Sequence, residues 1–224
     1  MKASIIIPAY NEEKAIGEVM RRVLALPIEK EIIAVENGST DRTGNELAKF
    51  ARRKEVTILR VKKNIGKGDA VRRALARAAG GVVVIQDADL EYPPEEIPKL
   101  VKPIADGAAD AVYGSRFLGS AGGMDLTHRF GNWFLSMAAR LLYGSRLTDI
   151  ETGHKAFRTG LIRAEELKSD TFEIENEIMA KLLKARCRIA EIPIAYHARS
   201  EGKKITVMDG VRLFLWLVRN RLAP

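Results

Sequence analysis

With 224 residues, of which 46% are hydrophobic and 29% charged, the chain has the composition of a globular protein with a substantial core. Its one cysteine, Cys187, excludes an internal disulfide framework and fits a reducing compartment. No apolar run approaches the roughly 20 residues that a membrane-spanning helix needs, and the first residues do not form a signal-peptide pattern.

The first half of the chain alternates apolar strands with amphipathic helices. Strands are predicted at 3–10, 30–37, 55–61 and 81–87, and helices at 12–26, 40–53 and 66–80. Continuous Ile and Val runs between helices favour a mostly parallel sheet that is covered on both faces. The sequence therefore predicts an α/β fold, in which ligands bind beyond the carboxyl ends of the strands.

Polar residues gather at those carboxyl ends. They occupy 8–12 after the first strand, 36–41 after the second, and Asp87 and Asp89 after the fourth. Three polar loops that meet in one crevice predict a binding site. Helix capping is the alternative for the single residues Asn11, Thr40 and Asp41.

Asp87, Asp89 and Glu91 stand before a helix entrance at Pro93 and Pro94. Side chains at i and i+2 of an extended segment point to the same side, so the two aspartates repel unless a cation lies between them. Hard divalent ions such as Mg²⁺ prefer oxygen ligands and often share them with substrate phosphates. The spacing is thus compatible with a metal site or with simple capping.

The third helix begins at a lysine between two glycines. No G-x-G-x-x-G follows the first strand, and "NIGKG" is not a Walker loop, so neither nucleotide fingerprint is present. Lys67 in this turn is placed to contact a diphosphate, and a solvated turn lysine is the alternative.

Two helices of the second half carry wide apolar faces. Segment 207–222 has one stripe formed by Val207, Val211, Phe214, Leu215, Val218 and Leu222, widened by Met208, Leu213 and Leu217. Its remaining face holds Arg212, Trp216 and Arg219. Segment 127–143 has a stripe of Phe130, Trp133, Phe134, Met137 and Leu141. Both patterns suit a helix in a membrane interface, and packing against the domain or a second subunit would use the same residues.

The net charge of +8 is concentrated near the C-terminus. Residues 180–224 carry ten Lys or Arg against three Asp or Glu. Such a segment favours phosphates, an anionic membrane surface or nucleic acid as a partner. No nucleic-acid partner is expected, because no recognition motif is visible.

Four ordered motifs, "SIIIPAYNEEKAI", "VENGSTDRT", "NIGKGDAVRRAL" and "QDADLEYPPEEIPKL", resemble those of family 2 glycosyltransferases with the GT-A fold. The stretches "YGSRFL", "RFGNWFLSMAARLLYGSRLTDIETGHKAFR" and "FEIENEIMAKLL" are similar to the polyprenyl-phosphate hexosyltransferases, which include the dolichyl-phosphate mannosyl- and glucosyltransferases. This resemblance implies one GT-A domain over 1–224. Its parts would be a Rossmann-like nucleotide-sugar-binding half at 1–115, an acceptor half at 116–200, and an amphipathic C-terminal helix within 201–224.

The resemblance also implies that "DAD" is a DXD motif, which binds Mg²⁺ or Mn²⁺ and, through it, the diphosphate of a UDP- or GDP-hexose. Asp89 would be the main ligand, with Asp87 and Glu91 beside it. Further donor contacts would come from Pro8, Tyr10, Glu12, Glu36, Lys67, Arg199 and Lys203. Glu36 and Asn37 stand where many relatives have two aspartates, so the resemblance does not identify the base.

The implied reaction is inverting transfer of the hexose to a dolichyl or undecaprenyl phosphate. That acceptor is already an anion, so it needs cations to hold it rather than a general base. Arg116 and Arg129 match positions that bind the acceptor phosphate, and with Asp89 they are the expected catalytic residues. Asp149 and Glu151 would brace the arginines or act as a base for a different acceptor. His154 is expected to be a packed, hydrogen-bonded histidine.

Two alternatives remain from the sequence. One is a family 2 glycosyltransferase with a soluble glycan or protein acceptor, and the other is a non-catalytic nucleotide-sugar-binding protein. The expected location is the cytoplasm, peripheral at the cytoplasmic face of the membrane through the C-terminal helix. A homodimer is a further expectation.

Overall fold

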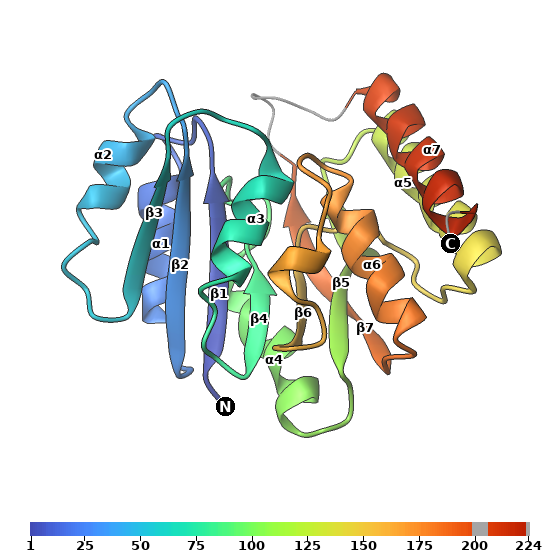
Figure 1. Cartoon of the computed structure of the whole chain (residues 1–224), viewed down its shortest axis with the longest axis horizontal. Helices are drawn as coiled ribbons and strands as arrows, with labels where there is room; N and C mark the ends of the chain where they lie inside the picture. Colours follow the sequence, from blue (N-terminus) through green and yellow to red (C-terminus); the bar gives the residue numbers. More distant parts are fainter. Residues whose placement is uncertain (199–205, 223–224) are drawn as a thin grey trace.

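A seven-stranded sheet in the order β3-β2-β1-β4-β6-β5-β7 forms the centre of the molecule (Figure 1). The computed structural model describes residues 1–198 and 206–222. The strands are β1 (Ala3–Ala9), β2 (Lys30–Asn37), β3 (Val56–Val61), β4 (Val82–Ile85), β5 (Ala111–Gly122), β6 (Lys155–Arg158) and β7 (Ile189–His197). Neighbouring strands are parallel except for β6, which is antiparallel to both β4 and β5. The predicted mostly parallel α/β sheet is confirmed.

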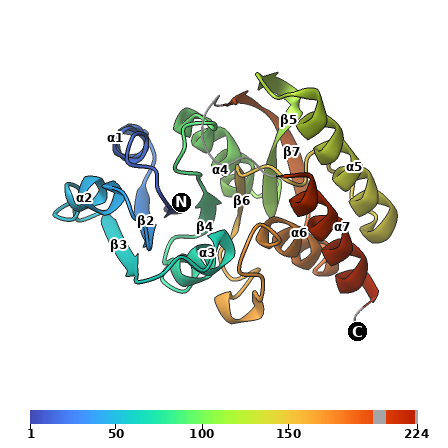
Figure 2. The same cartoon turned by 90° about the horizontal axis from the view of Figure 1, so that it is seen from above.

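Helices cover both faces of this sheet (Figure 2). They are α1 (Ile16–Ala25), α2 (Thr43–Ala48), α3 (Lys67–Leu75), α4 (Ile97–Ala105), α5 (Leu126–Tyr143), α6 (Ile174–Lys184) and α7 (Val207–Leu222), with short 3-10 turns at Pro94–Glu96 and Ala164–Glu166. Ile5 and Ile7 of β1 belong to the apolar cluster that includes residues of α1, α2 and α4, whereas Ile6 belongs to the cluster that includes residues of α3, α5, α6 and α7. Both faces of the strand are therefore buried, which explains its unbroken apolar run.

The reversed strand β6 sets the shape of the site edge. Its first residue, Lys155, lies opposite Ile85, the last residue of β4, and also opposite Tyr113 of β5. The segment that leads into β6 therefore reaches the same sheet edge as the loops that follow β1, β2 and β4. Segments from both sides of residue 115, the boundary predicted between the two parts of the chain, thus meet at one edge of the sheet. This is the upper edge in Figure 1.

The predicted fourth strand was too long. It ends at Ile85 rather than at residue 87, and residues 88 and 89 form a turn. Leu90 has a positive φ of 62°, which sharply reverses the chain after Asp89. The i and i+2 geometry of an extended strand, on which the pairing of Asp87 with Asp89 was predicted, therefore does not apply.

Helices α5 and α7 pack side by side and run in the same direction (Figure 2). The rings of Phe134 and Phe214 lie 5.3 Å apart, and the Tyr143 hydroxyl donates to the carbonyl of Leu217 at 2.9 Å. Leu213 and Leu217 are fully buried in the core. The predicted stripe of α7 is thus divided, because these two residues pack inward while other apolar residues stay outside.

Candidate active site

The loops after β1 and β2 bind each other. Asn11, which has a positive φ of 55°, accepts a hydrogen bond from the Thr40 amide at 2.9 Å, and its own amide donates to Ser39. Asp41 accepts from the amides of Glu13 and Thr43. Asn11 and Thr40 hold one loop to the next rather than capping a helix. Asp41 does both, because Thr43 is the first residue of α2 and the Asp41 carboxylate caps its amide.

Residues that were predicted to contact the nucleotide sugar lie on and beside these loops. Glu36 accepts from the Ser39 amide at 2.6 Å, and Tyr10 is exposed, with Pro8 and Glu12 half-buried next to it. The amide group of Asn37 donates to Asn64 and to the carbonyl of Gly66, both at 3.0 Å. Asn37 thereby ties the second loop to the turn that precedes Lys67.

Asp87 lies between a lysine and a glycine. Its Oδ1 is 2.6 Å from the Lys67 ammonium, which also lies 2.8 Å from Oε1 of Glu175. Its Oδ2 faces Gly153 so closely that a Cβ added to the glycine would lie 2.0 Å away. Burial lowers the pKa of Lys67, but Asp87 and Glu175 outweigh it, so this pKa is raised. Lys67 therefore remains charged at the site, and the alternative of a solvated turn lysine is wrong.

Asp89 and Glu91 occupy the turn that follows. Oδ1 of Asp89 accepts from the Glu91 amide at 3.1 Å, and the Glu91 carboxylate accepts from the Tyr196 hydroxyl at 2.8 Å. Within the described residues no group of three His, Cys, Asp or Glu side chains forms a metal cage. Two half-buried carboxylates at one turn still fit a hard divalent ion of the Mg²⁺ type, which usually binds one or two carboxylates together with substrate phosphates.

Arg116, on β5, forms a buried ion pair with Asp149. Its Nε and Nη2 each donate to Asp149 at 2.7 Å, and the Asp149 side chain is fully buried. The guanidinium also lies over the Tyr196 ring, 5.4 Å from its centroid. The expectation that Asp149 braces Arg116 is confirmed, and Tyr196 connects this pair to Glu91.

Glu151 and His154 are buried beside the ion pair. Oε1 of Glu151 has no hydrogen-bond partner among the described residues. Burial raises the pKa of Glu151 to about 8, against the effect of Lys155 and with that of Glu175. Burial also lowers the pKa of His154 to about 3, and its Nε2 lies 3.0 Å from Oε1 of Gln86. His154 is therefore the packed, hydrogen-bonded histidine that the sequence predicted.

The raised pKa of Glu151 predicts a pH-dependent stability. A folded-state pKa near 8 lies above the ordinary 4.5, so the carboxyl group favours folding fully below pH 4.5, and this contribution is lost as the pH rises to 8. The free energy of unfolding of Glu151→Gln minus that of wild type should therefore increase from pH 5 to pH 9, by on the order of 4 kcal/mol, because only wild type must ionise this buried group. Urea denaturation at both pH values measures this difference, and a difference independent of pH would contradict it.

Three further cations were predicted for the site, namely Arg129, Arg199 and Lys203. Arg129 is exposed on the first turn of α5, which Asp125 caps by accepting from the His128 amide at 2.9 Å. Among the described residues, no hydrogen bond or ion pair joins the Arg129 side chain to the other predicted site residues. Arg199 and Lys203 lie outside the described residues.

An exposed apolar surface covers the outer sides of α5 and α7. We call it the α5–α7 face, formed by Leu126, Phe130, Trp133, Phe134, Leu141, Met208, Val211, Leu215 and Leu222. A gathering of exposed apolar side chains on two neighbouring helices is typical of an interaction site. Neither helix can cross a bilayer, and no helix in 1–198 or 206–222 is long and apolar enough to do so.

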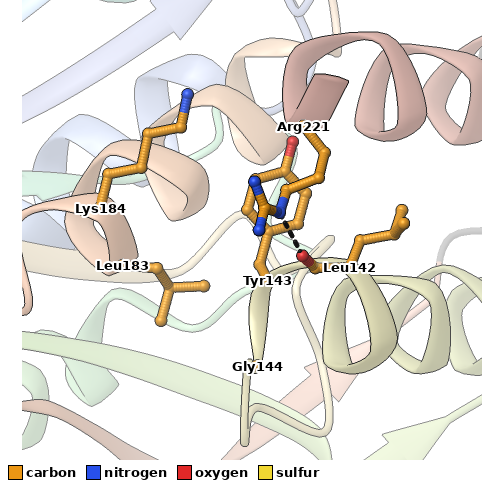
Figure 3. Close-up of a pocket in the computed structure, with 6 residues that line it drawn as sticks. All are labelled: Leu142, Tyr143, Gly144, Leu183, Lys184 and Arg221. Carbon is orange, nitrogen blue, oxygen red and sulfur yellow. Dashed lines mark hydrogen bonds between the residues drawn. The ribbon is translucent and has the colours of Figure 1, made fainter. Parts of the chain in front are cut away.

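A separate cavity of about 440 Å³ lies between the C-terminal ends of α5, α6 and α7 (Figure 3). Its described lining residues are Leu142, Tyr143, Gly144, Leu183, Lys184 and Arg221. Arg221 donates to the carbonyl of Leu142 at 2.7 Å, and cations near helix C-termini offset the helix dipoles. These roles explain the cations of this cavity without a ligand.

Sequence reasoning did not select Glu175, Lys155, Tyr92 or Tyr196, which all contribute to the site. Lys155 and Glu175 form a buried ion pair, and the Tyr92 hydroxyl accepts from the amide of Gly153 at 3.0 Å. A lysine that opens the apolar strand "KAFR" was the available signal, because a charged residue on a buried strand requires a partner. The partner itself lies 20 residues away and could not be named.

Comparison with known proteins is consistent with this geometry. The Glycosyl transferase family 2 model matches residues 4–164. The chain is 31% identical to the dolichol-phosphate mannosyltransferase of Pyrococcus furiosus, over 97% of this chain and 62% of that protein. It is 30% identical to the dolichyl-phosphate hexose transferase of Haloferax volcanii, over 92% of this chain and 88% of that protein.

Solved structures support the same fold. Glucosyl-3-phosphoglycerate synthase from Mycobacterium tuberculosis, in complex with Mn²⁺, UDP and phosphoglyceric acid, superimposes with a TM-score of 0.79 at 20% sequence identity. The match covers 100% of this chain and 79% of that one. At this level of identity the likeness establishes the GT-A fold and does not extend to the acceptor.

Proposed function

Because the chain belongs to glycosyl transferase family 2 and is a glycosyltransferase, we propose that it transfers a hexose from a UDP- or GDP-sugar to a polyprenyl phosphate. The observation that carries this proposal is the α5–α7 face, which places apolar and aromatic side chains next to Arg129 on the first turn of α5. An acceptor with a phosphate head and a prenyl chain needs a cation and an apolar surface side by side. Relatives named for dolichyl-phosphate and undecaprenyl-phosphate acceptors agree with this choice.

The donor would bind over the loops that follow β1, β2 and β4. Asp89, with Asp87 and Glu91 beside it, would hold a divalent ion, which supplies positive charge for the diphosphate. Lys67 would add a fixed positive charge at the start of α3, where the helix N-terminus also favours anions. Residues 8–12 and Glu36 would contact the nucleoside.

The reaction would be a direct displacement at C1 of the sugar. A phosphate oxygen of the acceptor attacks C1 as the bond from C1 to the diphosphate breaks, which inverts the anomeric centre and releases the nucleoside diphosphate. Arg129 and the Nη1 side of Arg116 would hold the attacking phosphate, because Nε and Nη2 of Arg116 are engaged by Asp149. Asp149 is thereby paired with Arg116, so it is not free to deprotonate a hydroxyl acceptor.

Incubating the purified chain with Mn²⁺, a panel of nucleotide sugars and a short prenyl phosphate tests the proposal. Mass spectrometry should find one sugar linked to the prenyl phosphate. Transfer to a soluble glycan or protein, with none to the lipid phosphate, would instead support the rival acceptor.

We further propose that the α5–α7 face lies against the cytoplasmic face of an anionic membrane, with Arg129, Arg212 and Arg219 at its borders. Val211→Ser/Leu215→Ser should then weaken binding to vesicles that contain phosphatidylserine by at least about tenfold, because the exposed half of each apolar side chain, 47% and 51%, would no longer be buried in the lipid. Both residues are exposed, so folding should be preserved. Cosedimentation measures the effect, and phosphatidylcholine vesicles show how much depends on charge.

A second copy of the chain is the alternative partner for this face. If the Val211→Ser/Leu215→Ser variant binds vesicles like wild type but changes from dimer to monomer in light scattering, the face is a dimer interface.

A further inference from the structure

Glu175 lies at the centre of a buried chain of charges behind Asp87. It is the second residue of α6 and is 3% exposed, and its two carboxylate oxygens contact two different lysines. Oε1 lies 2.8 Å from the Lys67 ammonium, and Oε2 contacts the Lys155 ammonium. The four groups follow one another as Lys155, Glu175, Lys67 and Asp87.

Lys155 cannot itself reach a substrate. Its side chain is fully buried, and its ammonium lies 4.9 Å from the centroid of the Tyr113 ring on the neighbouring strand. A buried ammonium is costly unless it is paired. The ion pair of Lys155 with Glu175 therefore fixes the orientation of the Glu175 carboxylate.

Lys67, in contrast, is at the edge of the site. Its side chain is 16% exposed, and its ammonium meets Asp87 at 2.6 Å and Glu175 at 2.8 Å. These two contacts are ion pairs, and an ammonium group carries three N–H donors, so an anion at the exposed side of Lys67 can bind the same ammonium. The position of the ammonium is set by the two carboxylates.

The backbone around Lys67 is held by the same segment that leads into α6. A Cβ on Gly66 would lie 2.3 Å from the carbonyl oxygen of Asp170, and one on Gly68 would lie 2.1 Å from that of Ser169. The Asp69 amide donates to the Asp170 carbonyl at 3.2 Å. The segment before α6 thus fixes the backbone at Lys67, and Glu175 fixes its ammonium.

We propose that Glu175 is a positioning residue that holds Lys67 as a second cation for the donor diphosphate, in addition to the divalent ion. The inference rests on the proposed nucleotide-sugar donor. It predicts that part of the affinity for a nucleoside diphosphate depends on Glu175 and Lys67 even when no divalent ion is bound. Glu175 itself touches no substrate, because both of its oxygens are occupied by lysines.

Nucleotide binding measured by calorimetry tests this assignment. UDP and GDP are each titrated into the full chain, in EDTA and in Mn²⁺. The nucleotide with the lower Kd is then used for the variants. Glu175→Gln should raise its Kd by about tenfold in both conditions, as should Lys67→Met. The double variant should be no weaker than Lys67→Met alone, because the two residues act as one unit. Mn²⁺ affinity in the absence of nucleotide, followed by electron paramagnetic resonance, should change less than twofold in Glu175→Gln.

Glu173→Gln is the matched control, since Glu173 lies one residue before α6 and is not buried. Its Kd should stay within twofold of wild type. If Glu175→Gln fails to fold, Lys155→Met/Glu175→Gln removes the buried pair together and should show the same tenfold rise.

An unchanged nucleotide Kd in Glu175→Gln, or additive effects of the two single variants, would overturn the positioning role. Loss of Mn²⁺ affinity without loss of nucleotide affinity would assign Glu175 to the metal instead. If wild type bound neither UDP nor GDP in Mn²⁺, the proposed function would fail first, and this inference with it.

Discussion

Asp89→Asn is expected to lower kcat/KM for the nucleotide-sugar donor by about 10²–10³-fold, the usual effect of losing one charged contact to a developing negative charge. Asparagine keeps an oxygen that can accept from the Glu91 amide, which Asp89 Oδ1 does at 3.1 Å, so the turn after β4 should persist. What the variant loses is the charge that would hold the divalent ion. Initial rates over a Mn²⁺ titration should show a weaker apparent metal affinity as well as the lower rate.

Asp106→Asn is the control for this experiment. Asp106 is exposed at the end of α4, where it pairs with Lys102 at 2.7 Å, so its activity should equal that of wild type. Normal metal-dependent turnover by Asp89→Asn would remove Asp89 from the metal site and leave the DXD assignment without support.

Arg116→Met should lower the free energy of unfolding by about 3–5 kcal/mol, because it leaves the fully buried Asp149 carboxylate without its cation. It should also abolish transfer, since Arg116 is proposed to hold the acceptor phosphate. Arg116→Met/Asp149→Leu replaces the pair with apolar groups and should recover most of the stability. The double variant should remain inactive. Urea denaturation and a transfer assay together separate the two roles.

Arg129→Met provides the contrast, because Arg129 is exposed and its loss should leave stability within about 0.5 kcal/mol of wild type. It should raise the KM for the prenyl phosphate. A stability loss below 1 kcal/mol for Arg116→Met would mean that the buried pair is not as costly to break as its geometry indicates.

The sheet and the succession of its first four strands along the chain followed from the sequence because apolar runs and helical periodicity are local signals. Helix lengths did not follow as well. The segment 40–53 has a helical pattern, but α2 spans only Thr43–Ala48 and begins after Asp41, whose carboxylate binds the amides of both Thr43 and Glu13 of the neighbouring loop. Long-range contacts of this type decide where an element begins, and periodicity does not record them.

The sequence predicted the loop residues at the edge of the sheet better than the buried residues behind them. Lys67 and Asp87 were both selected, but their ion pair joins residues 20 positions apart, and only the fold places them 2.6 Å from each other. Glu175 was not selected, because its partners are distant in sequence. A glutamate at the start of a helix is also common and gives no local signal of a site. The roles of Asp89, Arg116 and Arg129 in catalysis remain predictions.

The reversed strand β6 has a mechanical consequence. It pairs with β4 on one side and β5 on the other, so hydrogen bonds connect the strands β1 to β4 with β5 and β7 in one continuous sheet. A hinge between these two groups of strands would have to break the pairing of β6. We therefore expect any adjustment that accompanies ligand binding to occur in the loops at the sheet edge rather than within the sheet.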